Sequence, residues 1–287
     1  MLVSVILPVR NMAASLPAQL EALATQHTTR TFEVIVADHD SSDGLAGVVE
    51  AFIGRFEHLV VVDAATSSGV AGVRNAAIER SVGEVLAFCD ADDLVHADWL
   101  ENISSPVLES HCLAVGSRSG LITGTVAPPE EMWSTGSTPN IVMGHLRSGD
   151  TCNMALRRSD FDAVGGFDTT FRRSSDVDFV WRVQYAGVPV VTVPSARVLK
   201  GRPPRRLSLW RKHAGWGFQE PHLFRVHRLH GVPPRTGRQA AGEALNILRR
   251  MARNLVLDHR ISDQALNRSA RAAGRLWGSI RWRVWYP

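Results

Sequence analysis

The stretch that decides the fold of this 287-residue chain is Glu84-Val-Leu-Ala-Phe-Cys-Asp-Ala-Asp-Asp93. Its first half is a short apolar run that follows Gly83, which is the pattern of a buried strand. Three carboxylates, those of Asp90, Asp92 and Asp93, come directly after the run. We therefore expect them at the C-terminal end of the strand, which is the edge where open α/β sheets bind ligands.

This run of carboxylates indicates a cation site. Alternate residues of a strand point to the same side, so Asp90 and Asp92 are expected to converge if the strand geometry persists past its end. Two close carboxylates repel each other unless a cation lies between them, and hard oxygen ligands suit Mg²⁺ or Mn²⁺, particularly beside a substrate diphosphate. A solvated, aspartate-rich turn that leads into the next helix remains the alternative.

Strand and helix patterns alternate along residues 1–120, which predicts a mostly parallel sheet with helices on both faces. The expected strands are 3–7, 32–37, 59–62, 85–89 and one that begins at Leu113, and the expected helices are 15–26, 45–56, 70–81 and 97–109. Residues 116–148 show no helical period and are expected to form a functional loop region. Further strands are expected at 151–158 and 188–193, with a helix at 176–186 that Ser175 would cap.

Charge divides the chain into two regions. Residues 200–287 contain 19 Lys and Arg against four Asp and Glu, whereas residues 1–199 contain 13 and 24. We expect a catalytic domain over residues 1–200 and a basic, mainly helical extension over residues 201–287. The extension ends in arginines interleaved with tryptophans, which is compatible with packing on the domain, a membrane-surface helix, or a lid or partner contact. No recognition motif accompanies the basic charge, so nucleic-acid binding is not expected.

Composition also bears on location. No run reaches the roughly 18 apolar residues that span a bilayer, and the apolar N-terminus is too short for a signal peptide. The three cysteines, Cys89, Cys112 and Cys152, have no paired spacing, which is typical of a reducing compartment. We expect a cytoplasmic protein, and association with a membrane through the basic region is left open.

Seven segments carry a resemblance to a known family, in an order that is highly specific over roughly residues 1–195. They are Val3-Ser-Val-Ile-Leu-Pro-Val-Arg-Asn11, Phe32-Glu-Val-Ile-Val-Ala-Asp-His-Asp-Ser-Ser-Asp-Gly44, Gly69-Val-Ala-Gly-Val-Arg-Asn75, Gly83–Asp93, Cys152-Asn-Met-Ala-Leu-Arg-Arg158, Gly165-Gly-Phe-Asp168 and Asp176-Val-Asp-Phe-Val-Trp-Arg182. Together they resemble the inverting family 2 glycosyltransferases, which implies the GT-A fold, a Rossmann-like, mostly parallel sheet flanked by helices.

The resemblance also implies roles for the matching positions. The nucleotide-sugar-binding candidates are Pro8, Arg10, Asn11, Asp38, Arg74, Asp90 and Ala91. Asp90 and Asp92 are similar to the family's DxD pair, which holds a divalent cation on the donor diphosphate. Asp176 matches the catalytic base, and the dipole of its helix is expected to keep it ionised at neutral pH. His39 departs from the pattern, because relatives usually have a second acid there.

These features predict a metal-dependent, inverting transferase of the hexosyltransferase type that uses Mn²⁺ or Mg²⁺. Its donor would be a UDP-, GDP- or dTDP-sugar, and its acceptor a hydroxyl of a glycan, a lipid-linked or a small molecule. The processive synthases' Gln-x-x-Arg-Trp motif is absent from the sequence, which favours one transfer per encounter. One alternative is a nucleotidyltransferase, but that class needs a glycine-rich loop after the first strand, which residues Pro8–Met12 do not supply. The other alternative is a non-catalytic protein that binds sugar nucleotides. A metal ligand from the histidines at 213, 222, 227 or 230 is left open.

Overall fold

The computed structural model describes residues 2–121, 133, 140–201, 206–258 and 262–287. Contacts between Cα atoms divide the chain into two compact units. Unit 1 comprises residues 1–140 and 147–202, and unit 2 comprises residues 141–146 and 203–287. Each unit is described by itself below.

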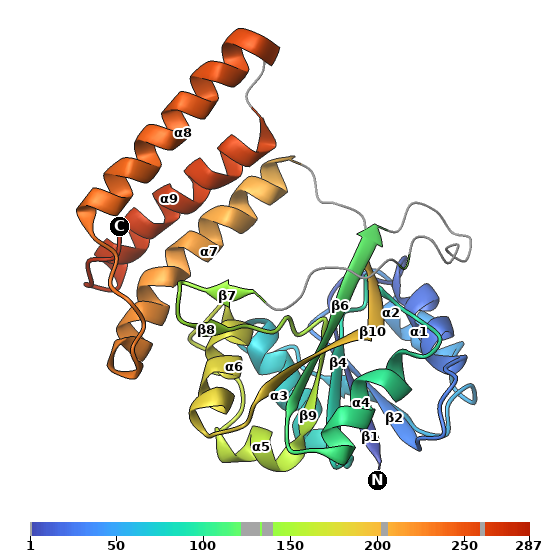
Figure 1. Ribbon diagram of the computed structural model, residues 1–287. Coiled ribbons are helices and arrows are strands. Elements are labelled where there is room, and N and C mark those ends of the chain that lie inside the picture. The colour runs from blue at the N-terminus through green and yellow to red at the C-terminus, as the bar shows by residue number, and fades with distance from the viewer. Residues whose placement is uncertain (1, 122–132, 134–139, 202–205, 259–261) are drawn as a thin grey trace. The chain divides into compact units, whose positions relative to one another are not determined.

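Unit 1 is built on an eight-stranded sheet with the order β3-β2-β1-β4-β9-β6-β10-β5 (Figure 1). Its strands are β1 (Val3–Val9), β2 (Phe32–Asp38), β3 (Leu59–Asp63), β4 (Val85–Cys89), β5 (Leu94–Val95), β6 (Leu113–Leu121), β9 (Asn153–Arg157) and β10 (Val190–Lys200). β1 to β4 run parallel, β9 is antiparallel to both of its neighbours, and β5 is antiparallel to β10. The mostly parallel sheet expected from the sequence is confirmed.

The order of the first four strands creates a ligand-binding position. β1 pairs with β2 on one side and with β4 on the other, with Val3–Ile6 opposite Val85–Phe88. The chain thus builds outward from β1 to β3 and then returns to the other side of β1. Such a switch point leaves a crevice beyond the carboxyl ends of the two strands, where open α/β sheets bind ligands.

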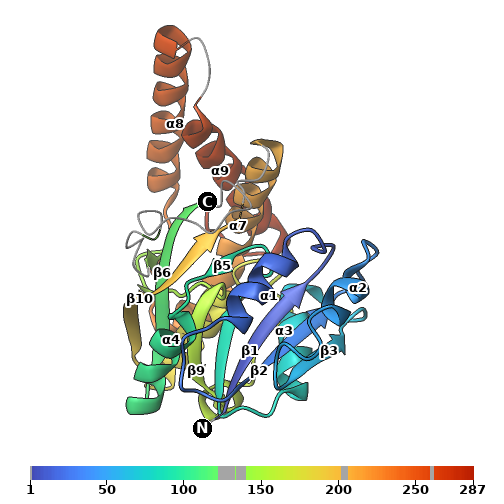
Figure 2. The same ribbon diagram turned by 90° about the vertical axis from the view of Figure 1, so that its right-hand side faces the viewer.

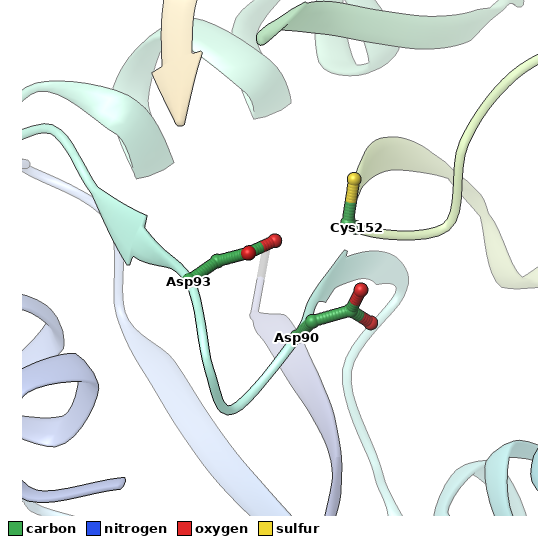
Figure 3. Close-up of side chains that lie close together, drawn as sticks. All are labelled: Asp90, Asp93 and Cys152. Carbon is green, nitrogen blue, oxygen red and sulfur yellow. The ribbon is translucent and has the colours of Figure 1, made fainter. Parts of the chain in front are cut away.

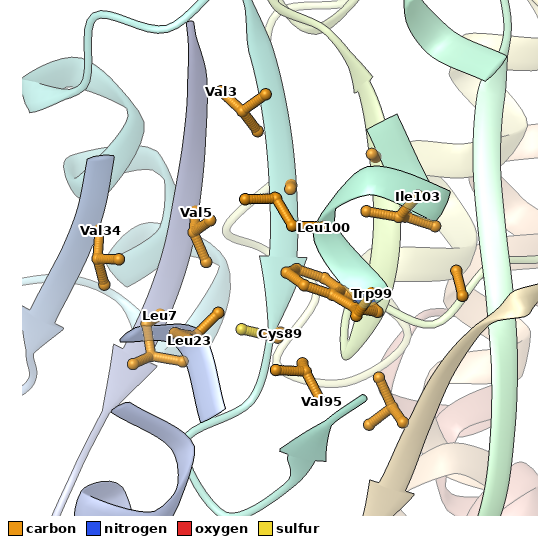
Figure 4. Close-up of a cluster of buried hydrophobic side chains, with 14 of the residues drawn as sticks. Val3, Val5, Leu7, Leu23, Val34, Cys89, Val95, Trp99, Leu100 and Ile103 are labelled. Carbon is orange, nitrogen blue, oxygen red and sulfur yellow. The ribbon is translucent and has the colours of Figure 1, made fainter. Parts of the chain in front are cut away.

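Helices cover both faces of this sheet (Figures 1 and 2). They are α1 (Leu16–Ala24), α2 (Leu45–Glu50), α3 (Gly69–Arg80), α4 (Trp99–Glu109), α5 (Arg158–Ala163) and α6 (Ser175–Tyr185). Alternation along the strands sends Val3, Val5 and Leu7 into a core with α1, α2 and α4 (Figure 4). Ile6 and its neighbours on the other face pack against α3, α5 and α6. The strands are therefore fixed from both sides, which holds their C-terminal ends in place.

Three local expectations differ from the structure. The helix expected over 45–56 is regular only over α2, and turns follow it that include Gly54 at a φ of +89°. Ser175 does not cap α6, because it is buried inside the first turn, and Ser174 in the cap position makes no side-chain cap bond. The loop region expected over 116–148 begins with strand, since β6 continues to residue 121, and most of the rest lies outside the described residues.

Unit 2 is helical. It contains α7 (Arg206–His227), the 3-10 turn η2 (Arg228–His230), α8 (Gly237–Asp258) and α9 (Asp263–Arg281), and strand β7 (Ile141–Val142) of the small hairpin completed by β8 (Leu146–Arg147). α7 and α9 approach so closely that a Cβ on Gly274 would lie 2.1 Å from the carbonyl oxygen of Ala214. Only glycine permits that backbone distance.

Polar and aromatic contacts lock this helix pair. Glu220 of α7 accepts hydrogen bonds from Arg271 and Arg275 of α9. His222 stacks on Trp282 with ring centroids 3.8 Å apart. One tryptophan of the C-terminal segment therefore packs within unit 2. No helix among the described residues is long and apolar enough to cross a membrane.

Candidate active site

The site begins where β4 ends. All five residues of β4 are buried, and the chain then turns, with the N–H of Asp93 donating to the carbonyl of Asp90 at 3.4 Å. This turn breaks the alternation of the strand, so Asp92 is exposed while the side chain of Asp93 points inward. The strand geometry on which the expected convergence of Asp90 and Asp92 depended therefore does not persist past β4. Asp93 lies close to Asp90 at this turn.

Asp90, Asp93 and Cys152 form a compact cluster at this turn (Figure 3). One ligand atom from each lies within 4.8 Å of the others. Burial raises the pKa of the Cys152 thiol well above its ordinary value, so the sulfur stays protonated and is a poor ligand for a hard cation. Of the three groups, only the two carboxylates have the oxygen chemistry that fits Mg²⁺ or Mn²⁺.

Two side-chain cations balance these carboxylates. Arg74 lies 3.2 Å from one oxygen of Asp90, and the Lys200 ammonium lies 3.5 Å from the other. Lys200 also donates to Asp93 at 2.5 Å, and the N–H of Gly201 donates to the same carboxylate at 3.1 Å. Even so, burial raises the pKa of Asp93 to about 7, because desolvation outweighs the attraction of the ammonium. The site therefore holds a carboxylate whose charge a further cation would stabilise.

Sequence reasoning missed Lys200, which is the last residue of β10. Only the pairing of β10 beside β6 and β5 brings residue 200 back to the end of β4, over a hundred positions away in sequence. The signal that remained in the sequence is a lone lysine directly after the apolar pair Val198-Leu199, and that pattern is not specific.

A cavity of about 390 Å³ adjoins Asp90 at the switch point. It is lined by Pro8, Val9, Arg10, Met12, His39, Val70, Val73, Arg74, Asp90, Ala91 and Asp92. Its walls combine apolar side chains with two guanidinium groups, and its volume is typical of small-molecule sites. The cavity brings together the residues after β1 with those after β4, as the switch point predicts.

Most of the nucleotide-binding candidates lie in this cavity, but two do not line it. The carboxylate of Asp38 accepts the N–H of Ser41 at 3.0 Å, and Asn11 accepts the N–H of Ser42 at 2.8 Å. Asn11 also adopts a φ of 51°, a left-handed conformation that asparagine tolerates. These two side chains therefore shape the turn beside the cavity, while His39, which the sequence marked as unusual, lines it directly.

Asp176 stands in the first turn of α6, and its carboxylate accepts the N–H of Val177 at 2.9 Å. Burial raises the pKa of Asp176 to about 6, the negative charge of Asp150 adds to the rise, and Arg74 opposes it. Desolvation therefore outweighs the helix dipole, which was expected to favour the ionised form. With a pKa near 6, the carboxylate is ionised at neutral pH and still holds a proton far better than an ordinary aspartate.

A second aspartate on α6 fixes the helix that carries Asp176. Asp178 is buried and accepts two bonds from Arg182, the shorter at 2.7 Å. The same guanidinium donates to the carbonyls of Val164 and Gly166. Asn75 of α3 exchanges hydrogen bonds with the backbone of Phe167 in that loop. The loop therefore ties α6 to the helix that supplies Arg74.

Another cavity, of about 370 Å³, lies at the opposite edge of the sheet, where β4 begins. It is lined by Glu84, Val85, Arg157, Arg158, Ser159 and Asp162. Its two arginines donate to main-chain carbonyls of neighbouring segments. It lacks the group of carboxylates seen at the end of β4, and we do not assign chemistry to it.

Comparison with known proteins follows this geometry. The profile described as Glycosyl transferase family 2 matches residues 4–165. Glycosyltransferase AglE of Haloferax volcanii is 29% identical over 190 residues, which cover 64% of this chain and 62% of that protein. The chain thus spans about three fifths of the length of that relative.

Two solved structures share the fold. The mannosyltransferase PcManGT from Pyrobaculum calidifontis, in complex with GDP-Man and Mn²⁺, superposes with a TM-score of 0.64 at 21% identity, covering 96% of this chain and 87% of its own. TarS of S. aureus, residues 1–349 in complex with UDP, gives a TM-score of 0.57 at 19% identity, covering 100% and 93%. At this identity the likeness establishes the fold alone.

Proposed function

Because this chain belongs to glycosyl transferase family 2 and has the GT-A fold expected from its sequence, we propose that it is a glycosyltransferase. It would move a sugar from a nucleotide-sugar donor to an acceptor hydroxyl, with inversion at the anomeric carbon and a divalent cation as cofactor. Residues 1–200 would form the catalytic domain, and residues 201–287 would serve acceptor or surface recognition.

One observation carries the proposal: Arg74 acts on two carboxylates at once. It forms an ion pair with Asp90 beside the 390 Å³ cavity, and its charge also lowers the pKa of Asp176. This shared cation supports a position for Asp176 within electrostatic reach of the cavity in which a donor would be bound. A binding module has no use for a proton acceptor beside its ligand, whereas a transferase requires one.

The proposed reaction is a single displacement. Asp176 accepts the proton of the acceptor hydroxyl while the hydroxyl oxygen forms a bond to the anomeric carbon of the donor. The bond between that carbon and the diphosphate oxygen breaks on the opposite face, and the nucleoside diphosphate leaves with the electron pair. A pKa near 6 suits this role, because the base is free of a proton at neutral pH and still has useful proton affinity.

The departing diphosphate gathers negative charge, and the cations of the site are placed to meet it. Arg74 reaches the cavity directly, whereas Lys200 reaches the carboxylates of Asp90 and Asp93. Asp90 and Asp92 would hold Mn²⁺ or Mg²⁺ from the cavity side, with Asp93 behind them. When bound, such an ion supplies Lewis-acid stabilisation of the leaving group.

The comparisons support a nucleotide-sugar donor without choosing among donors. One related protein was solved with GDP-Man and another with UDP. We therefore propose a UDP-, GDP- or dTDP-sugar as donor and a glycan, lipid-linked or small-molecule hydroxyl as acceptor, with one transfer per encounter.

A thermal-shift screen of the three donor classes, with and without Mn²⁺, tests donor binding. A donor present at 100 times its Kd stabilises the folded state by about 2.7 kcal/mol, which raises the unfolding midpoint measurably. The outcome expected is a shift for one nucleotide class that grows when Mn²⁺ is present. No shift with any donor would contradict the proposal.

The variant Asp176→Asn separates an enzyme from a binder. It removes the proton acceptor and keeps the shape of the side chain, so donor-induced stabilisation should persist while transfer is lost. If the wild-type chain and the variant released nucleoside diphosphate at the same rate, Asp176 would not be the base.

A further inference from the structure

The helices of unit 2 expose an unusual amount of apolar surface. Of the 18 large hydrophobic side chains that are exposed among the described residues, 13 belong to unit 2. Exposed apolar patches of this kind mark protein or membrane contacts. The same part of the chain carries 17 of the 32 basic residues of the protein.

Four of these exposed side chains form a stripe along one face of α8. Leu245, Leu248, Leu255 and Val256 are 47%, 63%, 59% and 73% exposed. At about 100° per residue, they fall within an arc of roughly 100° on the helix surface. The sequence places Ala244, Leu245, Leu248, Met251 and Leu255 at an amphipathic period, and the structure shows that the three leucines of this set face outward.

The packing side of α8 is a different face. Ile247 is buried, and Glu243 is paired with Arg235 and Arg275 of the same unit. Arg250 donates to Gln264 of α9 at 3.1 Å. Since these contacts already attach α8 to the rest of unit 2, the leucine stripe is not needed for that attachment.

Arginines border the stripe. Arg249 and Arg253 are exposed and follow one another by one helical turn, next to the arc of the leucines. Neither guanidinium forms an ion pair with a described acidic residue. The acidic side chains Glu220 and Glu243 are neutralised inside the unit, so the field around α8 is positive. An apolar stripe flanked by unpaired arginines matches the interface of a bilayer that contains anionic lipid.

We propose that α8 is a membrane-docking helix that lies on the surface of an anionic bilayer, with Leu245, Leu248, Leu255 and Val256 in the boundary of the acyl chains. Arg249 and Arg253 meet lipid phosphates beside the stripe. The attraction is both apolar and electrostatic, so it requires both groups of residues and weakens as salt screens the charges. This docking is independent of the reaction proposed above.

Sedimentation with vesicles tests the proposal on the full chain. Vesicles of phosphatidylcholine with one third phosphatidylglycerol should bind the protein in 0.05 M NaCl and release most of it in 0.5 M NaCl. Vesicles of pure phosphatidylcholine should bind it weakly. Failure of the wild-type chain to sediment with anionic vesicles at low salt would overturn the proposal.

Variants locate the contact. The double variant Leu248→Ser and Leu255→Ser should lose at least about tenfold in vesicle affinity, because two exposed leucines leave the stripe. Its matched control is Ile53→Ser with Val82→Ser, which removes two side chains that are 71% and 72% exposed in unit 1. The control should bind as the wild type does. Equal losses in both would refute a role for α8.

The charges and the competing occupant need their own measurements. The variant Arg249→Gln with Arg253→Gln should lose about tenfold or more on anionic vesicles, since each cation contributes roughly fivefold near such a surface. A second copy of the chain is the other candidate occupant of the stripe. If light scattering showed a wild-type dimer that the double serine variant dissociates, and vesicles bound neither protein, the stripe would be a dimer contact and the proposal would fail.

Discussion

Replacing Asp176 with asparagine is expected to abolish transfer and, at neutral pH, to stabilise the protein. The pKa of Asp176 is raised to about 6 from the ordinary 3.8 of an aspartate. A raised pKa means that the folded state holds the proton more tightly than the unfolded chain does. Stability is therefore fully present below pH 3.8 and is lost as the pH rises through 6. Asparagine has no such proton, so the variant escapes the loss.

The magnitude follows from the two pKa values. Between pH 4.5 and pH 7.5, the wild-type chain should lose about 2 kcal/mol of unfolding free energy that the variant keeps. For a domain of this size, the difference in Tm between variant and wild type should grow by about 4 °C over that range. Transfer should meanwhile fall by at least about a hundredfold, which is the usual contribution of a general base.

Differential scanning calorimetry at a series of pH values measures the first effect, and release of nucleoside diphosphate measures the second. Asp162→Asn is the matched control, because Asp162 is exposed and lies at the opposite edge of the sheet. The control should keep both the activity and the pH dependence of the wild type. If Asp176→Asn showed the same pH dependence of Tm as the wild-type chain, the pKa of Asp176 would not be raised in the folded state.

Three further outcomes are expected. The transfer rate should decline as the pH drops below about 6, where Asp176 becomes protonated. Asp150→Asn should shift this decline to lower pH, because the charge of Asp150 raises the pKa of Asp176. An unchanged profile would show that another group controls the rate. Lys200→Met should lower the Mn²⁺ concentration that half-saturates the protein by about fivefold, because the ammonium that competes for Asp90 is gone and such an ion pair contributes about 1 kcal/mol. Weaker Mn²⁺ binding would mean that Lys200 assists the ion. Asp178→Asn should destabilise unit 1 by about 3 kcal/mol in urea, because it leaves the guanidinium of Arg182 without its buried partner, and a loss below about 1 kcal/mol would indicate that this pair does not hold α6.

The pattern of the sequence was sufficient for the mostly parallel sheet and for the position of the carboxylates at one edge of it. Apolar runs of five to seven residues followed by polar turns predict parallel strands, because only a strand buried on both faces lacks alternation. The placement of Asp90 and Arg10 around one crevice follows from that topology. The conformation of the turn after β4 could not be predicted, because the sequence of a strand does not indicate at which residue its alternation ends. Asp93, rather than Asp92, therefore faces Asp90.

The sequence by itself determined which local structures form and which residues follow them, since periodicity and turn residues act over a few positions. Only the tertiary structure decided the proton affinities and the charge pairs. Desolvation of Asp176 and Asp93 depends on everything packed around them, and Lys200 reaches Asp90 across more than a hundred residues. Packing likewise decided which face of α8 is buried. The same amphipathic period fits a buried face or a free one, and only the contacts made through Ile247 and Glu243 leave the leucines outside.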